Sequence, residues 1–168
     1  MAAALATIER HGNDLDVRFV RHYPRPVETV WAALTDPDRL ADWMGPARVE
    51  PTVGGRFDLM TDSVHGSTGT VRVWDPPRIL EFTWSNTHSK DAVIRYELTP
   101  EDDGTRLVLR HSGMPYLTSA LMLPGWHDFL ERLGIMVTGG TLRREMDFRT
   151  MQQTYIDHFE LRDVQLDP

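Results

Sequence analysis

The sequence predicts an α+β domain in which one long amphipathic helix lies across the apolar side of an antiparallel sheet. Three observations predict it. Segments that alternate apolar and polar residues recur along the chain, most clearly over residues 93–112. Two helix start signals follow the first such segment, between residues 26 and 43. Residues 126–138 carry apolar side chains at helical spacing and need a large apolar surface to cover them.

The first predicted elements are one strand and two short helices. Residues 16–23 alternate as a half-buried strand does. Pro26 suits the first turn of a helix, where its missing N–H needs no partner, and the helix dipole favours Glu28 in that turn. Asp36-Pro37 repeats the signal, with a side-chain oxygen ahead of a helix-compatible proline. We expect these two helices to close one end of the sheet.

Further alternating segments complete the predicted sheet. Phe57 and Leu59 share one face of a strand that follows a glycine turn, and Pro76-Pro77 marks a turn that cannot continue a sheet ladder. The remaining predicted strands are residues 65–74, 79–84, 93–99 and 105–112. In each of them the apolar residues share one face. The opposite, solvated face is predicted to carry Arg95, Glu97, Arg106 and Arg110.

The predicted domain covers residues 15–139, between an N-terminal tail over residues 1–14 and a C-terminal extension over residues 140–168. The tail begins with an Ala-rich stretch that we expect to be disordered. Residues 113–125 form an unusually apolar connection, which fits either a mobile lid or a dimer interface. We favour the interface, and hence a homodimer, because a large exposed apolar patch is a liability on a monomer.

The C-terminal extension is predicted to form one more amphipathic helix. Phe148, Met151 or Gln152, Tyr155 and Phe159 repeat at about helical spacing. Such a helix needs an apolar surface to pack on, and we expect it to lie on the domain or on a second subunit.

Composition excludes several classes of protein. The chain has no cysteine, so no disulfide can form. Its formal net charge is −7 and its arginines are scattered among acids, which disfavours a nucleic-acid surface. No segment approaches the roughly 20 apolar residues that span a bilayer, and no basic region precedes the short N-terminal apolar run. We therefore expect a cytoplasmic protein that binds no nucleic acid and does not insert into membranes.

A series of short motifs occurs in an order that resembles a known family. The motifs include Arg25–Trp31, Leu34–Pro37, Gly54–Phe57, Asp75–Arg78 and Gly125-Trp126. From about residue 15 to residue 139 the chain resembles the activator of heat shock protein ATPase homologue branch of the START-like, or SRPBCC, superfamily. The resemblance implies a helix-grip fold, in which a curved antiparallel sheet wraps around a long C-terminal helix and often encloses a cavity for an apolar small molecule. It implies no single activity, because relatives include lipid carriers, polyketide cyclases, hormone receptors and chaperone co-factors.

The candidate ligand-binding residues are large or amphipathic side chains on the predicted inner surface. A pocket for a small organic ligand is mostly apolar with few polar groups, which is also the composition of a core, and periodicity does not separate the two. His111 shares a face with Leu107 and Leu109, where a neutral imidazole could hydrogen-bond to a ligand or belong to a buried structural network. The candidates are Trp43, Phe57, Trp84, Tyr96, His111, Trp126, Phe129 and Leu130.

Binding of a small hydrophobic or aromatic molecule is the leading functional hypothesis. The seven histidines show no tight metal-ligand pattern, and the sequence offers no glycine-rich phosphate loop and no Ser-His-Asp order, so we expect no metal, no cofactor and no assigned catalytic residue. The first alternative is a cyclase-like or hydrolase-like enzyme in which His111 or Tyr96 performs acid–base chemistry. The second is a chaperone co-regulator. We do not favour it, because the eukaryotic activators carry an additional N-terminal chaperone-binding domain and only about 14 residues precede the first predicted strand.

Overall fold

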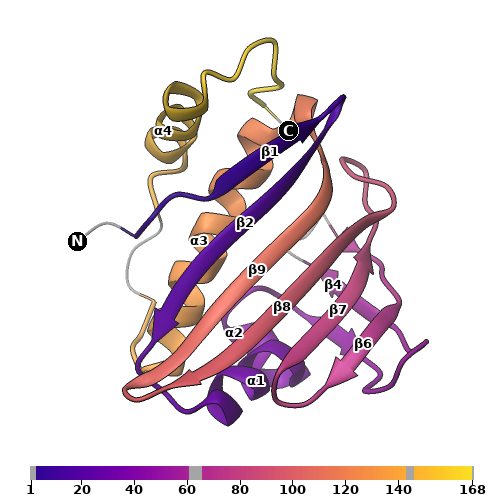
Figure 1. The fold of residues 1–168 in the computed structure, drawn as a ribbon, viewed down its shortest axis with the longest axis vertical. Helices are drawn as coiled ribbons and strands as arrows, with labels where there is room; N and C mark the ends of the chain where they lie inside the picture. Colours follow the sequence, from indigo (N-terminus) through magenta and orange to yellow (C-terminus); the bar gives the residue numbers. More distant parts are fainter. Residues whose placement is uncertain (1–2, 61–65, 143–145, 168) are drawn as a thin grey trace.

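The computed structural model describes residues 3–60, 66–142 and 146–167. Its main element is a six-stranded antiparallel sheet with the strand order β1-β2-β9-β8-β7-β6 (Figure 1). Strands that follow one another in the chain are neighbours in this sheet, except that β2 pairs with β9, the last strand. The strands are β1 Thr7–His11, β2 Asp14–Tyr23, β6 Val71–Asp75, β7 Ile79–Trp84, β8 Ala92–Glu101 and β9 Gly104–Pro115.

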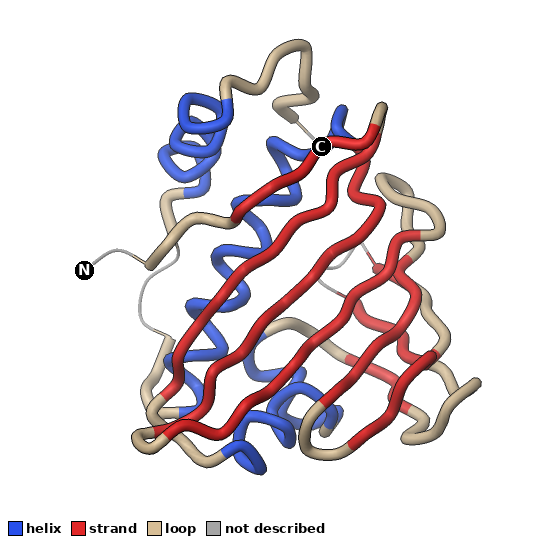
Figure 2. Tube along the Cα trace, viewed as in Figure 1, coloured by secondary structure: helices blue, strands red, loops and turns tan. Residues whose placement is uncertain are grey.

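The helices lie on one side of this sheet, as Figure 2 shows. The long helix α3 (Ser119–Val137) runs along the sheet, and the short helices α1 (Val27–Thr35) and α2 (Pro37–Trp43) close one end. The α+β, helix-grip prediction is therefore confirmed. None of the helices in the described parts of the chain has the length and apolar character needed to cross a membrane.

The two short helices begin where the sequence predicts. Pro26 is the N-cap of α1, and the Asp36 side chain accepts a hydrogen bond of 3.0 Å from the backbone N–H of Asp38 at the start of α2. At the end of α2, Trp43 Nε1 donates to the carbonyl oxygen of Ala33 at 2.9 Å. This bond fixes the indole ring on the inner side of the grip, where Trp43 is 1% exposed.

Helix α3 is fixed to the sheet by side chains from the end of β2. The Tyr23 hydroxyl donates to the carbonyl oxygen of Leu130 at 2.9 Å, and Arg25 Nε donates to that of Val137 at 2.9 Å. Burial raises the pKa of Tyr23 far above its usual value, so the phenol stays protonated and can keep donating. The middle and the end of α3 are thus held at defined positions along the sheet.

A second, three-stranded sheet consists of β3 (Ala47–Val49), β4 (Phe57–Met60) and β5 (Gly66–Ser67). The single strand predicted over residues 65–74 divides into β5 and β6, and its first residue lies outside the described residues. The division occurs at Gly69, where a Cβ atom would clash with the carbonyl oxygen of Thr83. The chain passes there from one sheet to the other, a close backbone approach that only glycine permits.

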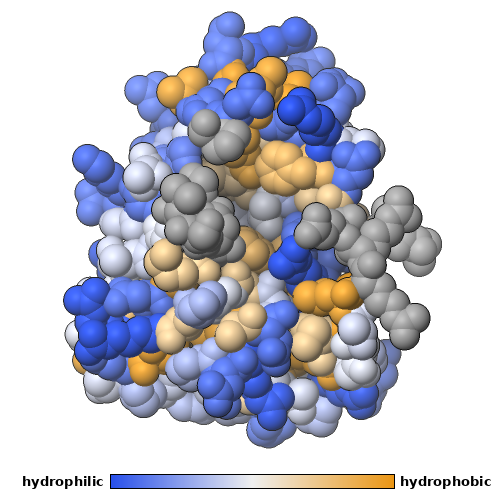
Figure 3. All heavy atoms as spheres, turned by 180° about the vertical axis from the view of Figure 1, so that it is seen from behind, coloured by the Kyte–Doolittle hydropathy of each residue, from blue (hydrophilic) through white to orange (hydrophobic). Residues whose placement is uncertain are grey.

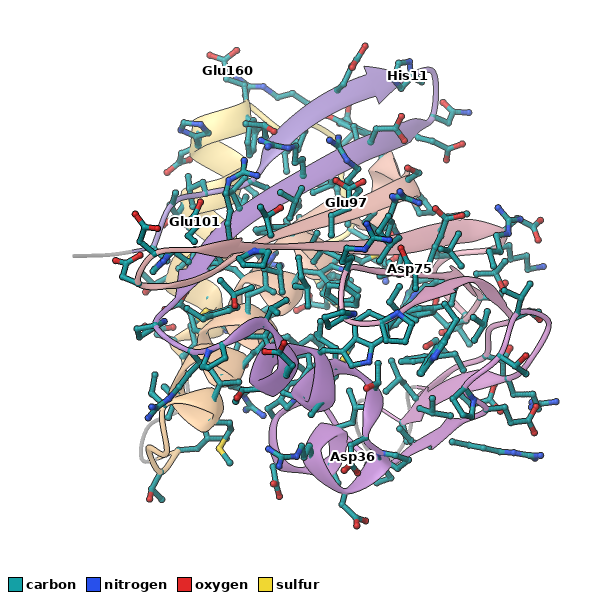
Figure 4. The ribbon with its side chains drawn as sticks, turned by 60° about the horizontal axis from the view of Figure 1, so that its bottom comes forward. His11, Asp36, Asp75, Glu97, Glu101 and Glu160 are labelled. Carbon is teal, nitrogen blue, oxygen red and sulfur yellow. The ribbon has the colours of Figure 1, made fainter. Side chains whose placement is uncertain are left out.

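The predicted alternation of buried and exposed residues holds in the central strands. Leu80, Phe82 and Trp84 of β7 are buried, as are the inward-facing residues of β8 and β9. On the opposite face Arg95 forms ion pairs of 2.9 Å with Glu81 and 2.7 Å with Glu97, and Figure 4 shows Glu97 on the face of the sheet away from α1 and α2. That face is polar, as predicted.

The N-terminal segment is more ordered than the sequence suggested. Within the predicted tail 1–14, residues 7–11 form β1, which pairs with β2 through a turn at Gly12. Ala6, within the stretch expected to be disordered, is 4% exposed. Strand β1 was not predicted because it is an edge strand whose side chains are mostly exposed, so backbone pairing rather than an apolar pattern holds it in place.

The prediction of an apolar connection over residues 113–125 is also wrong. Strand β9 continues to Pro115, a short 3-10 turn covers Tyr116–Thr118, and α3 begins at Ser119, well before the predicted start at Trp126. Met114, Ala120 and Leu123 are buried in the core, whereas Leu117 is 57% exposed. From the α3 side, apolar side chains at the surface are interspersed with polar ones (Figure 3). The segment is therefore not a loop, and both the lid and the dimer interface expected from it remain predictions.

Pro124 explains why the start of α3 was misplaced. A proline inside a helix removes one backbone hydrogen bond and usually marks a break. Here the carbonyl oxygen of Ala120, four residues earlier, accepts a hydrogen bond of 3.1 Å from Gln152 Nε2 instead. Gln152 belongs to α4 (Phe148–Phe159), so the predicted C-terminal helix exists and packs on α3. The distant helix supplies the donor that the proline lacks.

Candidate functional site

All eight predicted ligand-binding residues lie between α3 and the two sheets. They come from six elements: Trp43 from α2, Phe57 from β4, Trp84 from β7, Tyr96 from β8, His111 from β9, and Trp126, Phe129 and Leu130 from α3. Seven of them are at most 4% exposed, and Phe129 is half-buried. The fold therefore brings the predicted set together.

The aromatic members of this set form a chain of ring contacts that also includes Phe82. Phe57 stacks on Phe82 with ring centroids 4.0 Å apart, and Trp84 lies 5.3 Å from Trp126. Phe129 then connects Trp126, at 6.1 Å, to Trp43, at 6.4 Å. We call this group the aromatic cluster; its members are Trp43, Phe57, Phe82, Trp84, Tyr96, His111, Trp126 and Phe129.

Among the hollows that the described residues form, four of about 290 to 550 Å³ lie at the molecular surface. Of the eight predicted residues, only Leu130 lines one of them. The rings of the aromatic cluster contact one another, so an open cavity inside the grip stays a prediction. A guest there would have to part these rings.

His111 is the polar centre of the aromatic cluster. It is fully buried, and its Nδ1 atom accepts a hydrogen bond of 2.9 Å from Trp126 Nε1. Burial lowers the pKa of His111 to about 3, because an apolar environment disfavours the charged imidazolium. The ring is therefore neutral near neutral pH, and its Nε2 atom has no hydrogen-bond partner among the described residues.

Trp84 also has a buried polar atom that lacks a hydrogen-bond partner. It is 4% exposed, and its Nε1 atom also has no hydrogen-bond partner in the described part of the chain. The Trp84 ring centroid lies 6.3 Å from that of His111, and the His111 and Trp126 rings meet edge to face at 5.9 Å. Two unpartnered polar atoms thus occur on neighbouring rings in an otherwise apolar cluster.

A second buried polar group lies where β2, α3 and α4 meet, and the sequence analysis missed it. Arg21 is 7% exposed, with Nη1 donating to the carbonyl oxygen of Ala4 at 2.9 Å and Nε 3.4 Å from Glu131. Next to it, His127 Nδ1 lies 3.0 Å from the Tyr155 hydroxyl. The signal was present, because Arg21 occupies an inward position of the alternating strand β2.

This second group joins the termini to the domain rather than lining the grip. The Tyr155 hydroxyl accepts a hydrogen bond of 3.3 Å from the backbone N–H of Ala6. Burial, with a further contribution from the nearby Arg21 charge, lowers the pKa of His127 to about 4. A neutral His127 can therefore share a hydrogen bond with Tyr155 and hold α4 against α3.

One group of three potential metal ligands occurs among the described residues. His22, Glu101 and Asp103 are exposed at the end of the sheet, and Figure 4 shows Glu101 there. His22 Nε2 lies 3.1 Å from an Asp103 oxygen and 3.4 Å from a Glu101 oxygen. These distances equally suit ion pairs of a protonated histidine, and exposed acidic groups are common without a metal.

Comparisons with known proteins agree with the fold. A sequence model of the family described as Activator of Hsp90 ATPase homolog 1-like protein matches residues 24–138. A comparison with curated proteins found no match. Among solved structures, CalU16 from Micromonospora echinospora is 24% identical with a TM-score of 0.77, over 92% of this chain and 94% of CalU16.

Two further structures are similar at slightly higher identity. Protein MLL2253 from Mesorhizobium loti is 28% identical with a TM-score of 0.66, over 76% of this chain and 99% of that protein. DynU16, described as a protein in the dynemicin biosynthetic locus, is 29% identical with a TM-score of 0.69. That match covers 77% of this chain but only 49% of DynU16, so this chain corresponds to about half of that protein.

Proposed function

Because the chain belongs to the Activator of Hsp90 ATPase homolog 1-like family, we propose that it binds a small, largely aromatic or apolar molecule between α3 and the sheets. The binding residues are the eight that the sequence predicted, with Phe82 added by its ring contacts. An apolar lining with a few polar atoms is typical of small-molecule sites. The likeness to DynU16, with its place in a biosynthetic locus, supports an organic guest of biosynthetic origin.

The observation that carries the proposal is the pair of unpartnered nitrogens on Trp84 and His111. Buried polar side chains in native proteins are nearly always hydrogen-bonded, and each one left without a partner costs about 1–3 kcal/mol. A purely structural core would gain stability from Phe or Leu at these positions. A polar atom on a bound guest would offset the cost and explain why the two residues are retained.

Entry is proposed beside Phe129, because it is the half-buried member of the aromatic cluster. Its ring contacts Trp43 of α2 and Trp126 of α3, so rotation of the Phe129 side chain would open a gap between these two rings. The new contacts with a planar guest would replace the ring contacts that are lost.

Binding is favoured over acid–base catalysis by the electrostatics of His111. A general base works best when its pKa lies near the working pH. Burial holds the pKa of His111 at about 3, so the ring accepts a proton poorly near neutral pH. His111 therefore serves to orient a guest through a hydrogen bond.

Native mass spectrometry of the full chain, purified from its own host, tests the proposal. We expect a mass increment that is lost when the protein is denatured and that belongs to one small organic molecule. The control is the same protein after denaturation, extraction with organic solvent and refolding, which should regain the increment from the extract. A bare mass before extraction, together with no uptake from the extract, would contradict the proposal.

A further inference from the structure

We infer that the guest presents a neutral hydrogen-bond acceptor, such as the carbonyl oxygen of a ketone or quinone, to Nε2–H of His111 and Nε1–H of Trp84. This inference rests on the proposed function and adds to it the chemical class of the guest. It follows from the direction in which each hydrogen bond around His111 must run.

The hydrogen bond from Trp126 fixes the tautomer of His111. An indole Nε1–H can only donate, so the nitrogen that it contacts at 2.9 Å, His111 Nδ1, must be the acceptor. A neutral imidazole carries a single proton, which must then be on Nε2. The unpartnered atom of His111 is therefore a donor.

Trp84 presents a second donor nearby, because its Nε1–H has no acceptor role. Its ring centroid is 6.3 Å from that of His111, so the two unpartnered donors belong to neighbouring rings. A carbonyl oxygen has two lone pairs and can accept from both donors. One acceptor atom on the guest would satisfy both orphaned groups.

Charged guests fit this site poorly. An ammonium group can only donate and would face two further donors. A carboxylate could accept, but no member of the aromatic cluster carries a positive charge near neutral pH, so the anion would be buried without a counter-charge. The site thus selects neutral acceptors on an aromatic body.

The test compares three probes that share a naphthalene body: 2-acetonaphthone, 2-isopropylnaphthalene and 2-naphthoate. Isopropyl has nearly the shape of acetyl but accepts no hydrogen bond. Titrations of the full chain with each probe, monitored by calorimetry, should show that the ketone binds at least about tenfold more tightly than either other probe. A tenfold ratio of affinities corresponds to about 1.4 kcal/mol.

Two variants and one control attribute this preference to the proposed donors. His111→Phe and Trp84→Phe keep aromatic volume but remove one donor each, and each should reduce the preference for the ketone severalfold. Trp74→Phe is the matched control, because Trp74 contacts Trp31 at 5.4 Å outside the aromatic cluster. It should leave the preference unchanged.

The outcomes separate this inference from the proposed function. If the ketone and the hydrocarbon bind the unaltered protein equally, the inference fails and the proposed function stands. If no probe binds, the inference fails, and the native mass spectrum decides the proposed function. A nitrogen-15 NMR spectrum of the unaltered protein gives a second measurement that does not depend on the variants. A proton on Nδ1 of His111 would overturn the inference whatever the affinities.

Discussion

The inward position of His111 could be predicted from the sequence, but its hydrogen-bond partner and tautomer could not. Strand alternation placed it on the inner face, and the structure confirms that it is fully buried. No sequence pattern indicated that Trp126, fifteen positions later, would donate to it, because that contact depends on how α3 lies across β9. Arg21 is a similar case, since its inward position could be recognised but its contacts with Ala4 and Glu131 could not.

The buried imidazole predicts a specific pH dependence of stability. The ordinary pKa of histidine is 6.5 and burial lowers that of His111 to about 3. Between these values the unfolded chain binds a proton that the folded protein excludes, so His111 makes the fold less stable as pH falls through this window, by about 1.4 kcal/mol per pH unit. In His111→Phe this contribution is absent.

Urea unfolding at pH 6, 5.5 and 5 checks this prediction. The free energy of unfolding of the unaltered protein should fall relative to that of His111→Phe by about 1 kcal/mol from pH 6 to pH 5. Parallel pH profiles for the two proteins would show that His111 is not held neutral.

Helix start signals and strand alternation predicted well those helices and strands whose formation depends on residues close in the sequence. Asp36-Pro37 starts α2 because its cap and its proline act within one turn. Strand β1 was missed because its pairing is made by backbone groups, and α3 was shortened because Pro124 is compensated by Gln152, a contact between distant segments. Local patterns do not carry such long-range information.

The contact between α3 and α4 can be tested with a matched pair of glutamines. Gln152 is 8% exposed and donates from Nε2 to the carbonyl oxygens of Ala120 and Leu166. Gln152→Leu leaves the Ala120 carbonyl without a partner, and we expect it to lower the free energy of unfolding by about 1–3 kcal/mol.

Gln153→Leu is the control, because Gln153 is exposed and, among the described residues, its Nε2 atom donates to Asp157 on the same helix. We expect its effect to stay within about 0.5 kcal/mol. Equal effects of the two substitutions in urea unfolding would mean that α4 does not supply the missing donor of α3.

At the scale of the whole molecule, the sheet and the helix enclose an aromatic cluster whose polar atoms are not all satisfied. The sequence predicted the members of this cluster except Phe82, yet alternation could not distinguish side chains that fill a core from side chains that line a space. The ring contacts show that the rings meet one another, so a guest that inserts between them would displace these contacts.

Binding of a guest should raise the thermal stability of the protein. A guest that binds only the folded protein raises the unfolding temperature by mass action. With 2-acetonaphthone at about 100 times its dissociation constant, the stabilisation should approach about 2.7 kcal/mol. A scanning calorimetry series that shows no rise with ketone concentration would exclude binding to the folded state.

Intermolecular NOEs in a complex of the full chain with 2-acetonaphthone locate the bound guest. We expect NOEs from the naphthalene protons to the rings of Trp84, Trp126 and Phe129. NOEs confined to a surface hollow, such as the one lined by Tyr116 and Leu117, would contradict it.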